Sequence, residues 1–539
     1  MMPSTVRQLD PEALGGSALS TAILRREPDA LAFYAWDWGD PEHRAQAATA
    51  AAARPVDRNA LAGILAEQNR AWGASGNALT RTDVLRQPES VAVVTGQQLG
   101  LFAGPLYSIY KALSAVRYAE QIEAETGRPA VAVFWLAGED HDFEEVQTAT
   151  FTDGPDVHRV RYAPDAAGGP VGRMTLEADA LATTLRQLEA ALPEGPHREE
   201  VLELAGACYR PGVSMRDAFA RLLRRLAPGL ILMSVDDPRL KALAAPVFEQ
   251  EAADWGGTHE VLQDVSRQLE AAGFHAQVAP MPVNLFAFTE DGQRMPIDPE
   301  GEAFRLRGGE TLSRDELTRW TRDEPERLSP NVVLRPLVQD VLLPTVAYVA
   351  GPGEAAYFAQ LKSVYERFGI AMPIIWPRLS LTVVEPGVAK VLDRYELMLQ
   401  DLRDDLDAIW RNLAREASDT DLATAFGEAR GALHALAVQL YRPVTATSST
   451  LESALGAAQT KMVKALNRLQ TKTVRVEKRN HDDIRVRLER VYAALKPGGT
   501  LQERALSPLQ LAARHGLDVF VDLIGAIEPD PSVHHVVRL

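Results

Sequence analysis

The chain has 539 residues, more than one hydrophobic core usually organises, so we expect two or three structural units. Hydrophobic residues make up 46% and the net charge is −16, a balance that fits a globular protein and argues against nucleic-acid binding, which needs a basic surface. The single cysteine, Cys208, excludes a disulfide framework or a cysteine-rich zinc site; with neither a secretion signal nor a membrane-spanning run, we expect a cytoplasmic protein.

The first ninety residues are rich in alanine and have the pattern of helices. From residue 91 the pattern becomes strand, helix and strand, with VAVVTGQQLG before a long helical stretch and PAVAVFWLAGEDHDFEEV after it. Further apolar runs begin at residues 230, 345 and 372, and residues 151–213 have shorter strand-like pieces and polar turns. Uninterrupted apolar strands are typical of a parallel sheet covered on both faces, so the sequence predicts an α/β fold built from βαβ units.

After Pro386 the apolar period becomes that of a coiled coil. Val388, Leu392, Leu399, Leu406 and Leu413 form a heptad seam, and a later helix at 451–469 continues the spacing. The acidic stretch 393–407 and the basic stretch 461–490 predict that the two helices pair, within the chain or across a homodimer.

The sequence thus suggests six divisions of the chain. They are an N-terminal helical segment packed on the core (1–90), the first half of the core (91–150), an inserted segment (151–213), the second half of the core with a further insertion (214–386), a coiled-coil arm (387–495) and a C-terminal segment that returns to the core (496–539).

Three polar clusters follow predicted strands, where doubly wound sheets bind their ligands. The first, at 95–111, combines glycines with the start of a helix, whose free N–H groups suit an anion. The alternative is a tight connection between strand and helix. The substrate-binding residues assigned from this cluster are Thr95, Gln97, Gln98, Gly104, Pro105, Tyr107 and Lys111.

The second cluster, at 138–145, places five acids and one histidine in seven residues. Crowded carboxylates raise one another's pKa, and a histidine can take up or relay a proton near neutral pH. We therefore assign catalysis to this cluster, with His141 as the general base. Acids at a helix N-terminus, or a metal site, are the alternatives, and we assign no metal. The assigned residues are Asp140, His141, Asp142 and Glu144.

The third cluster follows the strand at 345–350 and continues downstream. An arginine between apolar residues often binds a carboxylate or a phosphate through two hydrogen bonds, and a structural ion pair is the alternative. We assign substrate binding to Gly351, Gly353, Glu354 and Tyr357, and cofactor binding to Arg378 and Ser380.

Four ordered segments, VVTGQQLGLFAGPLYSIYK, VFWLAGEDHDFEEV, AGPGEAAYFAQLK and WPRLSLTVVE, resemble the bacillithiol biosynthesis cysteine-adding enzymes of the BshC family. The tail segment GTLQERALSPLQLAARHG resembles the same family. The resemblance implies a Rossmann-type core related to class I aminoacyl-tRNA synthetases, connecting-peptide insertions and a coiled coil used for dimerisation. It also implies a ligase that adds L-cysteine to the amine of glucosaminyl malate, and a bound adenine nucleotide, ATP or ADP.

The sequence has no HxGH motif at the first turn, where TGQQLGLFAGPLY stands, and lacks the cysteines that hold zinc in related cysteine-activating enzymes. How the cysteine carboxylate is activated and how the thiol is recognised therefore stay open. A non-catalytic protein that binds a nucleotide or metabolite is the second hypothesis, and a scaffold that dimerises through its arm is the third. The missing synthetase motifs favour the second hypothesis, but the dense acidic cluster argues against it, since binding alone rarely needs so many ionisable groups. The polar clusters at the strand ends argue against the third.

Overall fold

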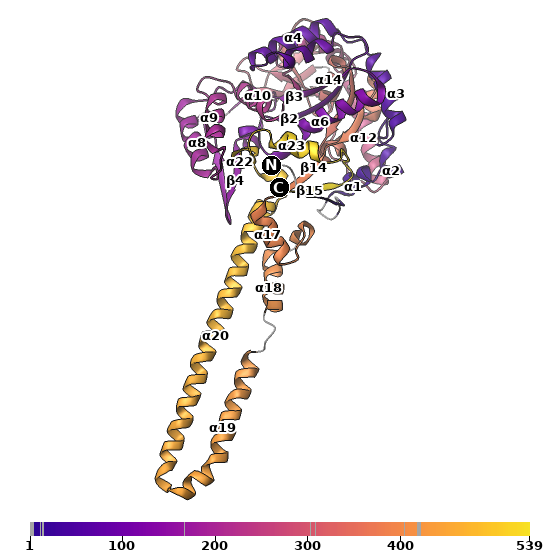
Figure 1. Cartoon of the computed structure of the whole chain (residues 1–539). Coiled ribbons are helices and arrows are strands. Elements are labelled where there is room, and N and C mark those ends of the chain that lie inside the picture. The colour runs from indigo at the N-terminus through magenta and orange to yellow at the C-terminus, as the bar shows by residue number, and fades with distance from the viewer. Residues whose placement is uncertain are drawn as a thin grey trace. The chain divides into compact units, whose positions relative to one another are not determined.

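The computed structural model describes residues 5–10, 12, 16–165, 168–301, 303–307, 309–403, 405–417 and 422–539 (Figure 1). The chain forms two compact units: the second consists of Pro386–Lys496 and the short piece Gly154–Asp156, and the first of the other described residues. The first unit carries the sheets, and the second is helical. Among the described residues, no helix has both the length and the apolar composition that a membrane span requires.

A five-stranded parallel sheet lies at the centre of the first unit, in the order β13-β12-β2-β3-β6. This is the 3-2-1-4-5 order of a Rossmann fold, and the order reverses between β2 and β12. The predicted parallel sheet is confirmed. Its strands are β2 (Val91–Gln98), β3 (Ala130–Ala137), β6 (Leu230–Met233), β12 (Thr345–Ala350) and β13 (Ile374–Pro377).

Apolar strands and long helices account for the burial of this sheet. All six residues of β12 are buried, as are seven of the eight in β3, because helices cover both faces. Helix α6 (Leu106–Thr126) packs against β2 and β3 and ends at Gly127, whose φ of 69° gives the left-handed cap that glycine adopts without strain (Figure 1). The N-terminal helices α3 (Pro41–Ala52) and α4 (Arg58–Ala71) also pack on the sheet, against β12 and β6. The helices that precede or follow the other core strands in the sequence are α10 (Met215–Leu226), α11 (Pro238–Ala253), α14 (Leu334–Leu342), α15 (Pro352–Phe358) and α16 (Lys362–Phe368).

Two insertions interrupt the core. The first follows β3 and contains a short helix, a two-stranded hairpin and two longer helices, so the prediction of strand-like pieces throughout 151–213 is wrong beyond the hairpin. Helices form there because leucines recur at helical spacing, as at Leu181, Leu185 and Leu188. The elements are α7 (Phe143–Val146), β4 (Thr148–Asp153), β5 (Asp156–Arg161), α8 (Ala178–Ala191) and α9 (Arg198–Cys208).

The second insertion lies between β6 and β12 and contains an antiparallel sheet in the order β10-β9-β8-β7-β11. Its last strand leads directly into α14, so this insertion supplies side chains close to the ends of the core strands. Its elements are α12 (Trp255–Ala271), β7 (Leu285–Phe288), β8 (Arg294–Glu300), β9 (Ala303–Leu306), β10 (Thr311–Ser313), α13 (Arg314–Asp323) and β11 (Leu328–Pro330).

The two ends of the chain meet in a third sheet, in which β15 lies between β1 and β14. The all-helical prediction for the first ninety residues thus missed the strand β1. The sheet consists of β1 (Thr5–Leu9), β14 (Ser380–Val384) and β15 (His534–Arg538). The N-terminal helices are α1 (Ala18–Leu24), α2 (Pro28–Leu31), α3 (Pro41–Ala52), α4 (Arg58–Ala71) and α5 (Asn77–Val84), and the tail helices are α21 (Gln502–Ala505), α22 (Pro508–His515) and α23 (Val519–Ala526).

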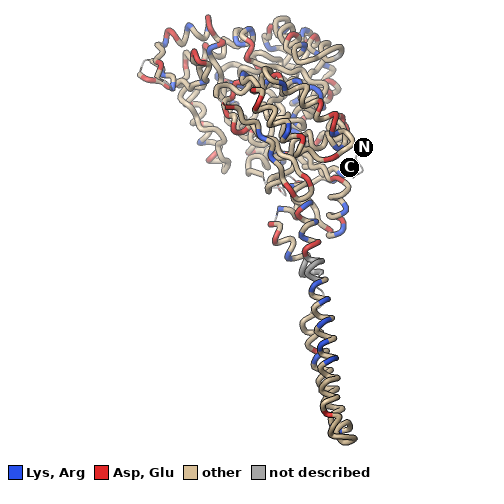
Figure 2. Tube along the Cα trace, turned by 90° about the vertical axis from the view of Figure 1, so that its left-hand side faces the viewer, with Lys and Arg blue, Asp and Glu red and all other residues tan. Residues whose placement is uncertain are grey.

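The second unit is dominated by a helical hairpin of α19 (Leu422–Thr447) and α20 (Glu452–Leu495), which lie side by side (Figures 1 and 2). The prediction of one continuous helix along the seam at 388–413 is wrong. The segment is divided into α17 (Pro386–Arg394), a short 3-10 helix and α18 (Leu406–Ala417). The break includes Glu396, whose φ is 52°. Both α17 and α18 pack on α20, and Arg485 pairs with Asp407 at 3.2 Å, so the acidic and basic stretches do meet within the chain.

Candidate active site

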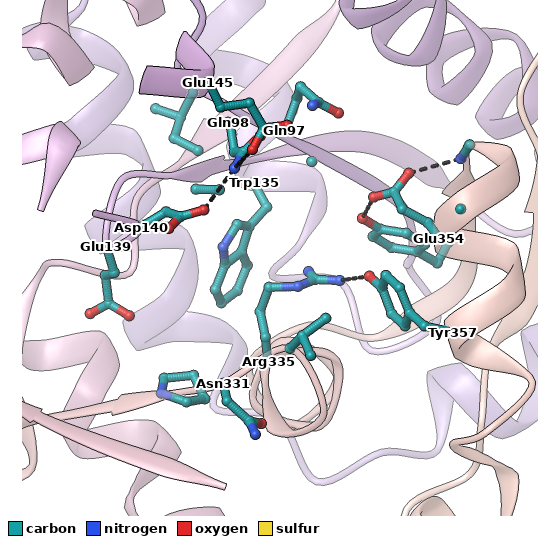
Figure 3. Close-up of a pocket in the computed structure, with 18 of the residues that line it drawn as sticks. Gln97, Gln98, Trp135, Glu139, Asp140, Glu145, Asn331, Arg335, Glu354 and Tyr357 are labelled. Carbon is teal, nitrogen blue, oxygen red and sulfur yellow. Dashed lines mark hydrogen bonds between the residues drawn. The ribbon is translucent and has the colours of Figure 1, made fainter. Parts of the chain in front are cut away.

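A cavity of about 810 Å³ opens at the carboxyl ends of β2, β3 and β12, beside the point where the strand order reverses (Figure 3). Doubly wound sheets bind their ligands at this position, because the two loops on either side of the reversal diverge and leave a crevice. The core strands contribute the turns at 96–98, 138–140 and 351–354, and the second insertion contributes residues 330–332 and Arg335.

One wall of the cavity is acidic. The side-chain amide of Gln98 donates to Asp140 Oδ2 at 2.7 Å and to Glu145 Oε2 at 2.9 Å, as the dashed lines in Figure 3 show. One amide group thus holds two carboxylates that arise from the loop after β3. Their remaining lone pairs can accept hydrogen bonds from a substrate ammonium or take a proton from it.

The structure brings only part of the predicted acidic cluster into the cavity. Asp140 lines it, whereas the side chain of His141 is 58% exposed and has Asp140 Oδ1 at 3.9 Å as its ion-pair neighbour. Asp142 accepts a hydrogen bond from the Glu145 backbone N–H and caps α7, which is the helix-terminus alternative, and Glu144 is also exposed. The proposed roles of His141, Asp142 and Glu144 in catalysis therefore stay predictions, without support from the cavity geometry.

The opposite wall carries a cation, Arg335, in the first turn of α14 (Figure 3). Its guanidinium donates to Tyr357 Oη at 2.9 Å and to Gln339 Oε1 at 3.2 Å, and it lies 5.1 Å from the ring centre of Tyr348. In the part of the chain that the structure describes, no carboxylate lies within ion-pair distance of Arg335. A part-buried guanidinium fixed by neutral partners retains the capacity to bind a carboxylate from a ligand.

Lys111 and Glu354 line the cavity but are committed to each other. The buried Lys111 ammonium donates to Glu354 Oε2 at 2.5 Å and to the carbonyl of Gly96. Glu354 also accepts from Tyr348 Oη at 2.7 Å and from the Gly351 N–H at 2.8 Å. Burial alone would raise the pKa of Glu354, but the Lys111 ammonium and these donors hold it below its ordinary value. The pair ties α6 to the first turn of α15.

Arg378 forms the structural ion pair that the sequence left open as an alternative. Its guanidinium donates twice to the Glu503 carboxylate, at 2.5 and 3.0 Å, and both side chains are buried. Ser380 donates to the same carboxylate at 3.0 Å and contacts His534. Both side chains are thus engaged with Glu503, and their assignment to a cofactor stays a prediction, although Arg378 lines the cavity.

The turn after β2 has the internal contacts of a tight connection, the alternative named above, and its role as an anion site stays a prediction. Thr95 is fully buried and donates to the carbonyl of Val349, while Gly104 and Pro105 do not line the cavity. The first N–H of α6, on Leu106, donates to the carbonyl of Leu506 at 2.8 Å, so it is not available to a phosphate. Of the residues predicted from this turn, those that line the cavity are Gln97, Gln98, Tyr107 and Lys111; from the third cluster they are Gly351, Gly353, Glu354 and Tyr357.

Sequence reasoning missed several residues of the cavity. Arg335 stands between apolar residues, in VVLRPLV, which is the same signal that drew attention to Arg378. Some of the others come from the second insertion and the tail, whose approach to the core strands no local pattern reveals. The rest lie on β3 and β12 or in the acidic cluster at 138–145. The missed lining residues include Trp135, Glu139, Glu145, Gln277, Arg294, Asn331, Tyr348 and Arg504. Glu139 is buried and pairs with Lys241, so its charge is already balanced.

The fold and the cavity define a Rossmann-like protein with its ligand crevice at the topological switch point and a second, coiled-coil unit. Residues 5–379 match the family model described as the bacillithiol biosynthesis BshC N-terminal Rossmann-like domain. Residues 381–539 match the BshC C-terminal coiled-coil domain. The chain belongs to the BshC family of bacillithiol biosynthesis.

Curated relatives cover nearly the whole chain. A protein of Salinibacter ruber is 43% identical over 98% of this chain and 97% of its own length, and its name is "Putative cysteine ligase BshC". Proteins of Chloroherpeton thalassium and Symbiobacterium thermophilum with the same name are 34% and 33% identical, over 92% and 97% of this chain and 92% and 98% of their own lengths.

Proposed function

We propose that this protein is a cysteine ligase of bacillithiol biosynthesis, which joins the carboxylate of L-cysteine to the amine of glucosaminyl malate. The names of its relatives support this function, and a single feature of the cavity carries the argument. Asp140 and Glu145 form an anionic wall that suits an ammonium, and Arg335 on the opposite wall suits a carboxylate. The two substrates bring both kinds of group.

The chemistry of the proposed reaction is amide formation. The nitrogen of glucosaminyl malate must lose a proton before its lone pair attacks the cysteine carbonyl carbon. As the amide C–N bond forms, the C–O bond breaks, and the former carboxylate oxygen leaves on the phosphoryl or adenylyl group that ATP has donated to it. Asp140 and Glu145 are placed to accept the proton, because both line the cavity and the Gln98 amide keeps them beside each other.

A free carboxylate does not acylate an amine in water without activation, so ATP belongs to the proposal as a co-substrate. Two donors that could face its phosphates are already used within the protein, because the first N–H of α6 is bonded to the Leu506 carbonyl and Arg378 is bonded to Glu503. The proposal therefore gives the residues of the turn after β2 no role in the activation of the cysteine carboxylate.

The direct test uses the purified protein with glucosaminyl malate and L-cysteine, in parallel reactions with ATP, with ADP and without nucleotide. We expect a product whose mass equals the sum of the two substrates less one water, and we expect it only with ATP. An Arg335→Met variant is the matched control. If both substrates bind but no reaction gives the product, the function is binding alone, which is the alternative that the names of the relatives do not favour.

We further propose that the protein is a cytoplasmic homodimer joined through its arm. Apolar side chains remain exposed along the helical hairpin: Val438 is 61% exposed, Leu469 56% and Val476 57%. An apolar stripe of this kind on a helix pair is stabilised when a second copy covers it.

A further inference from the structure

The position of Arg335 depends on the first turn of α14, and Asn331 fixes that turn. Asn331 Oδ1 accepts hydrogen bonds from the backbone N–H groups of Val333 at 2.9 Å and Leu334 at 3.2 Å. Its backbone carbonyl accepts the Arg335 N–H at 2.9 Å. These N–H groups have no partner within the helix, so a side chain that accepts from them determines where the helix begins.

The orientation of Asn331 is in turn fixed by Asn284. The Asn331 amide donates from Nδ2 to Asn284 Oδ1 at 2.8 Å, and the Asn331 backbone N–H donates to the Asn284 carbonyl at 3.0 Å. Both side chains are buried, with 5% and 0% of their surfaces exposed. Water therefore does not compete for these groups, and each oxygen must face a donor.

Glu251, on α11, determines which way the hydrogen bonds of Asn284 and Asn331 run. A single carboxyl oxygen, Oε1, accepts from the Asn284 backbone N–H and from Asn284 Nδ2, each at 2.9 Å. An acceptor at this point forces Nδ2 of Asn284 toward Glu251 and Oδ1 toward Asn331. Glu251 is completely buried and, among the residues that the structure describes, forms no ion pair.

We propose that Glu251, Asn284 and Asn331 are positioning residues, whose hydrogen bonds run in one direction and hold the first turn of α14 so that Arg335 faces the cavity. The proposal rests on the proposed function in one respect, namely that Arg335 binds a substrate carboxylate. It assigns a role to three buried side chains that are not proposed to contact the amine nitrogen or the carbonyl carbon between which the amide bond forms. Only the acceptor of Glu251 is needed for this role, not its charge.

The direction of the hydrogen bonds provides a sharp substitution test. In Asn284→Asp, an oxygen replaces the Nδ2 that donates to Glu251, so two acceptors face each other and this series of hydrogen bonds is broken. We expect KM for the substrate that Arg335 binds to rise about 10-fold, the equivalent of about 1.4 kcal/mol, with kcat within about 3-fold of wild type. Glu251→Gln keeps an acceptor at Oε1 and should leave KM unchanged.

A second measurement is independent of turnover. Hydrogen–deuterium exchange of peptides that cover residues 331–342 should be faster in Asn284→Asp, because the N–H groups of Val333 and Leu334 lose a fixed acceptor. Exchange in Glu251→Gln should match wild type. Asn331→Asp serves as the second variant if Asn284→Asp does not fold, because it keeps the acceptor for the helix and removes only the donor to Asn284.

Asn69 offers a matched control. Its side chain is buried like that of Asn284 and has fixed hydrogen bonds: Nδ2 donates to the Leu65 and Leu232 carbonyls, and Oδ1 accepts from the Leu232 N–H and from Arg224. It does not line the cavity. Asn69→Asp should lower the melting temperature to a similar degree without changing KM or the exchange of residues 331–342.

Two results would overturn the proposed positioning role. One is an Asn284→Asp protein whose KM and hydrogen exchange match those of Asn69→Asp. The other is a Glu251→Gln protein in which KM rises and the exchange of residues 331–342 becomes faster. If the wild-type protein makes no product, the proposed function fails, yet the exchange experiment still decides whether these three residues hold the start of α14.

Discussion

At the scale of single residues, the cavity separates groups that are already paired from groups that are free for a ligand. Lys111, Glu354 and Arg378 each have a charged partner inside the protein, so their charges are balanced before any ligand arrives. Among the described residues, the hydrogen-bond partners of Arg335 are the neutral side chains of Gln339 and Tyr357. Binding of a carboxylate there gains a charge-assisted pair without breaking an existing one.

We therefore expect Arg335→Gln to weaken binding of one carboxylate-bearing substrate by about 10- to 100-fold, the cost of about 1.5–3 kcal/mol for a hydrogen bond to a charged group. Steady-state kinetics with each substrate varied in turn will show which KM rises, and the melting temperature should change little. Unchanged KM values for both substrates would contradict the role of Arg335 in binding.

The proton acceptor is the second question at this scale. The sequence pointed to His141, but the cavity contains Asp140, and general-base catalysis is usually worth about 10²- to 10⁴-fold in rate. We expect Asp140→Asn to lower kcat by about 100-fold and His141→Ala to retain most of the wild-type rate. Rates from single-turnover reactions decide between them. If His141→Ala lowers kcat more than Asp140→Asn does, and its melting temperature is unchanged, His141 is the general base.

At the scale of elements, the sheet that joins the two ends of the chain contains a buried histidine. His534, on β15, contacts Ser380 Oγ at 2.8 Å and Thr382 Oγ1 at 2.9 Å on the adjacent β14. Burial lowers the pKa of His534 to about 4. The charged and titratable groups around it are Glu503, which opposes this shift, and Arg378 and His535, which add to it.

This histidine makes the sheet sensitive to acid. Its pKa in the folded protein lies below the ordinary value of about 6.5, so on acidification the unfolded chain takes up the proton first. Stability should therefore be complete above pH 7 and fall as the pH drops toward 4, with about 2 kcal/mol lost between pH 7 and pH 5 from this group. Urea unfolding at several pH values should show a smaller loss in His534→Gln. The exposed His158→Gln is the control, and an identical pH dependence in all three proteins would disprove the role of His534.

At the scale of the whole molecule, the arm is the feature whose apolar side chains stay exposed in a single copy of the chain. Val438 and Leu469 are exposed on the hairpin, so a charge at either position should not disturb the fold of one chain. We expect wild-type protein to be a dimer by light scattering at micromolar concentration, and Val438→Asp with Leu469→Asp to be a monomer. Val157→Asp, at an exposed apolar residue outside the arm, is the control. A monomeric wild type would contradict the dimer.

The sequence by itself determined the repeating elements of this protein. Uninterrupted apolar strands such as VAVFWLA can be buried only in a covered parallel sheet, and the position of a strand end marks the ligand crevice before any coordinates are known. Four ordered motifs gave the family, which the family models confirm. The relation to class I aminoacyl-tRNA synthetases stays a prediction.

Only the tertiary structure decided which polar residues share the cavity and which neutralise one another. Arg378 and Glu503 are 125 positions apart in sequence, and Glu251 acts on α14 through Asn284 and Asn331, so no local pattern could pair them. His141 and Asp140 are neighbours in the sequence, yet one is exposed to solvent and the other lines the cavity. The physical reason is that periodicity fixes the local elements, whereas the partners of a charged group depend on which distant loops the packing brings to the same strand ends.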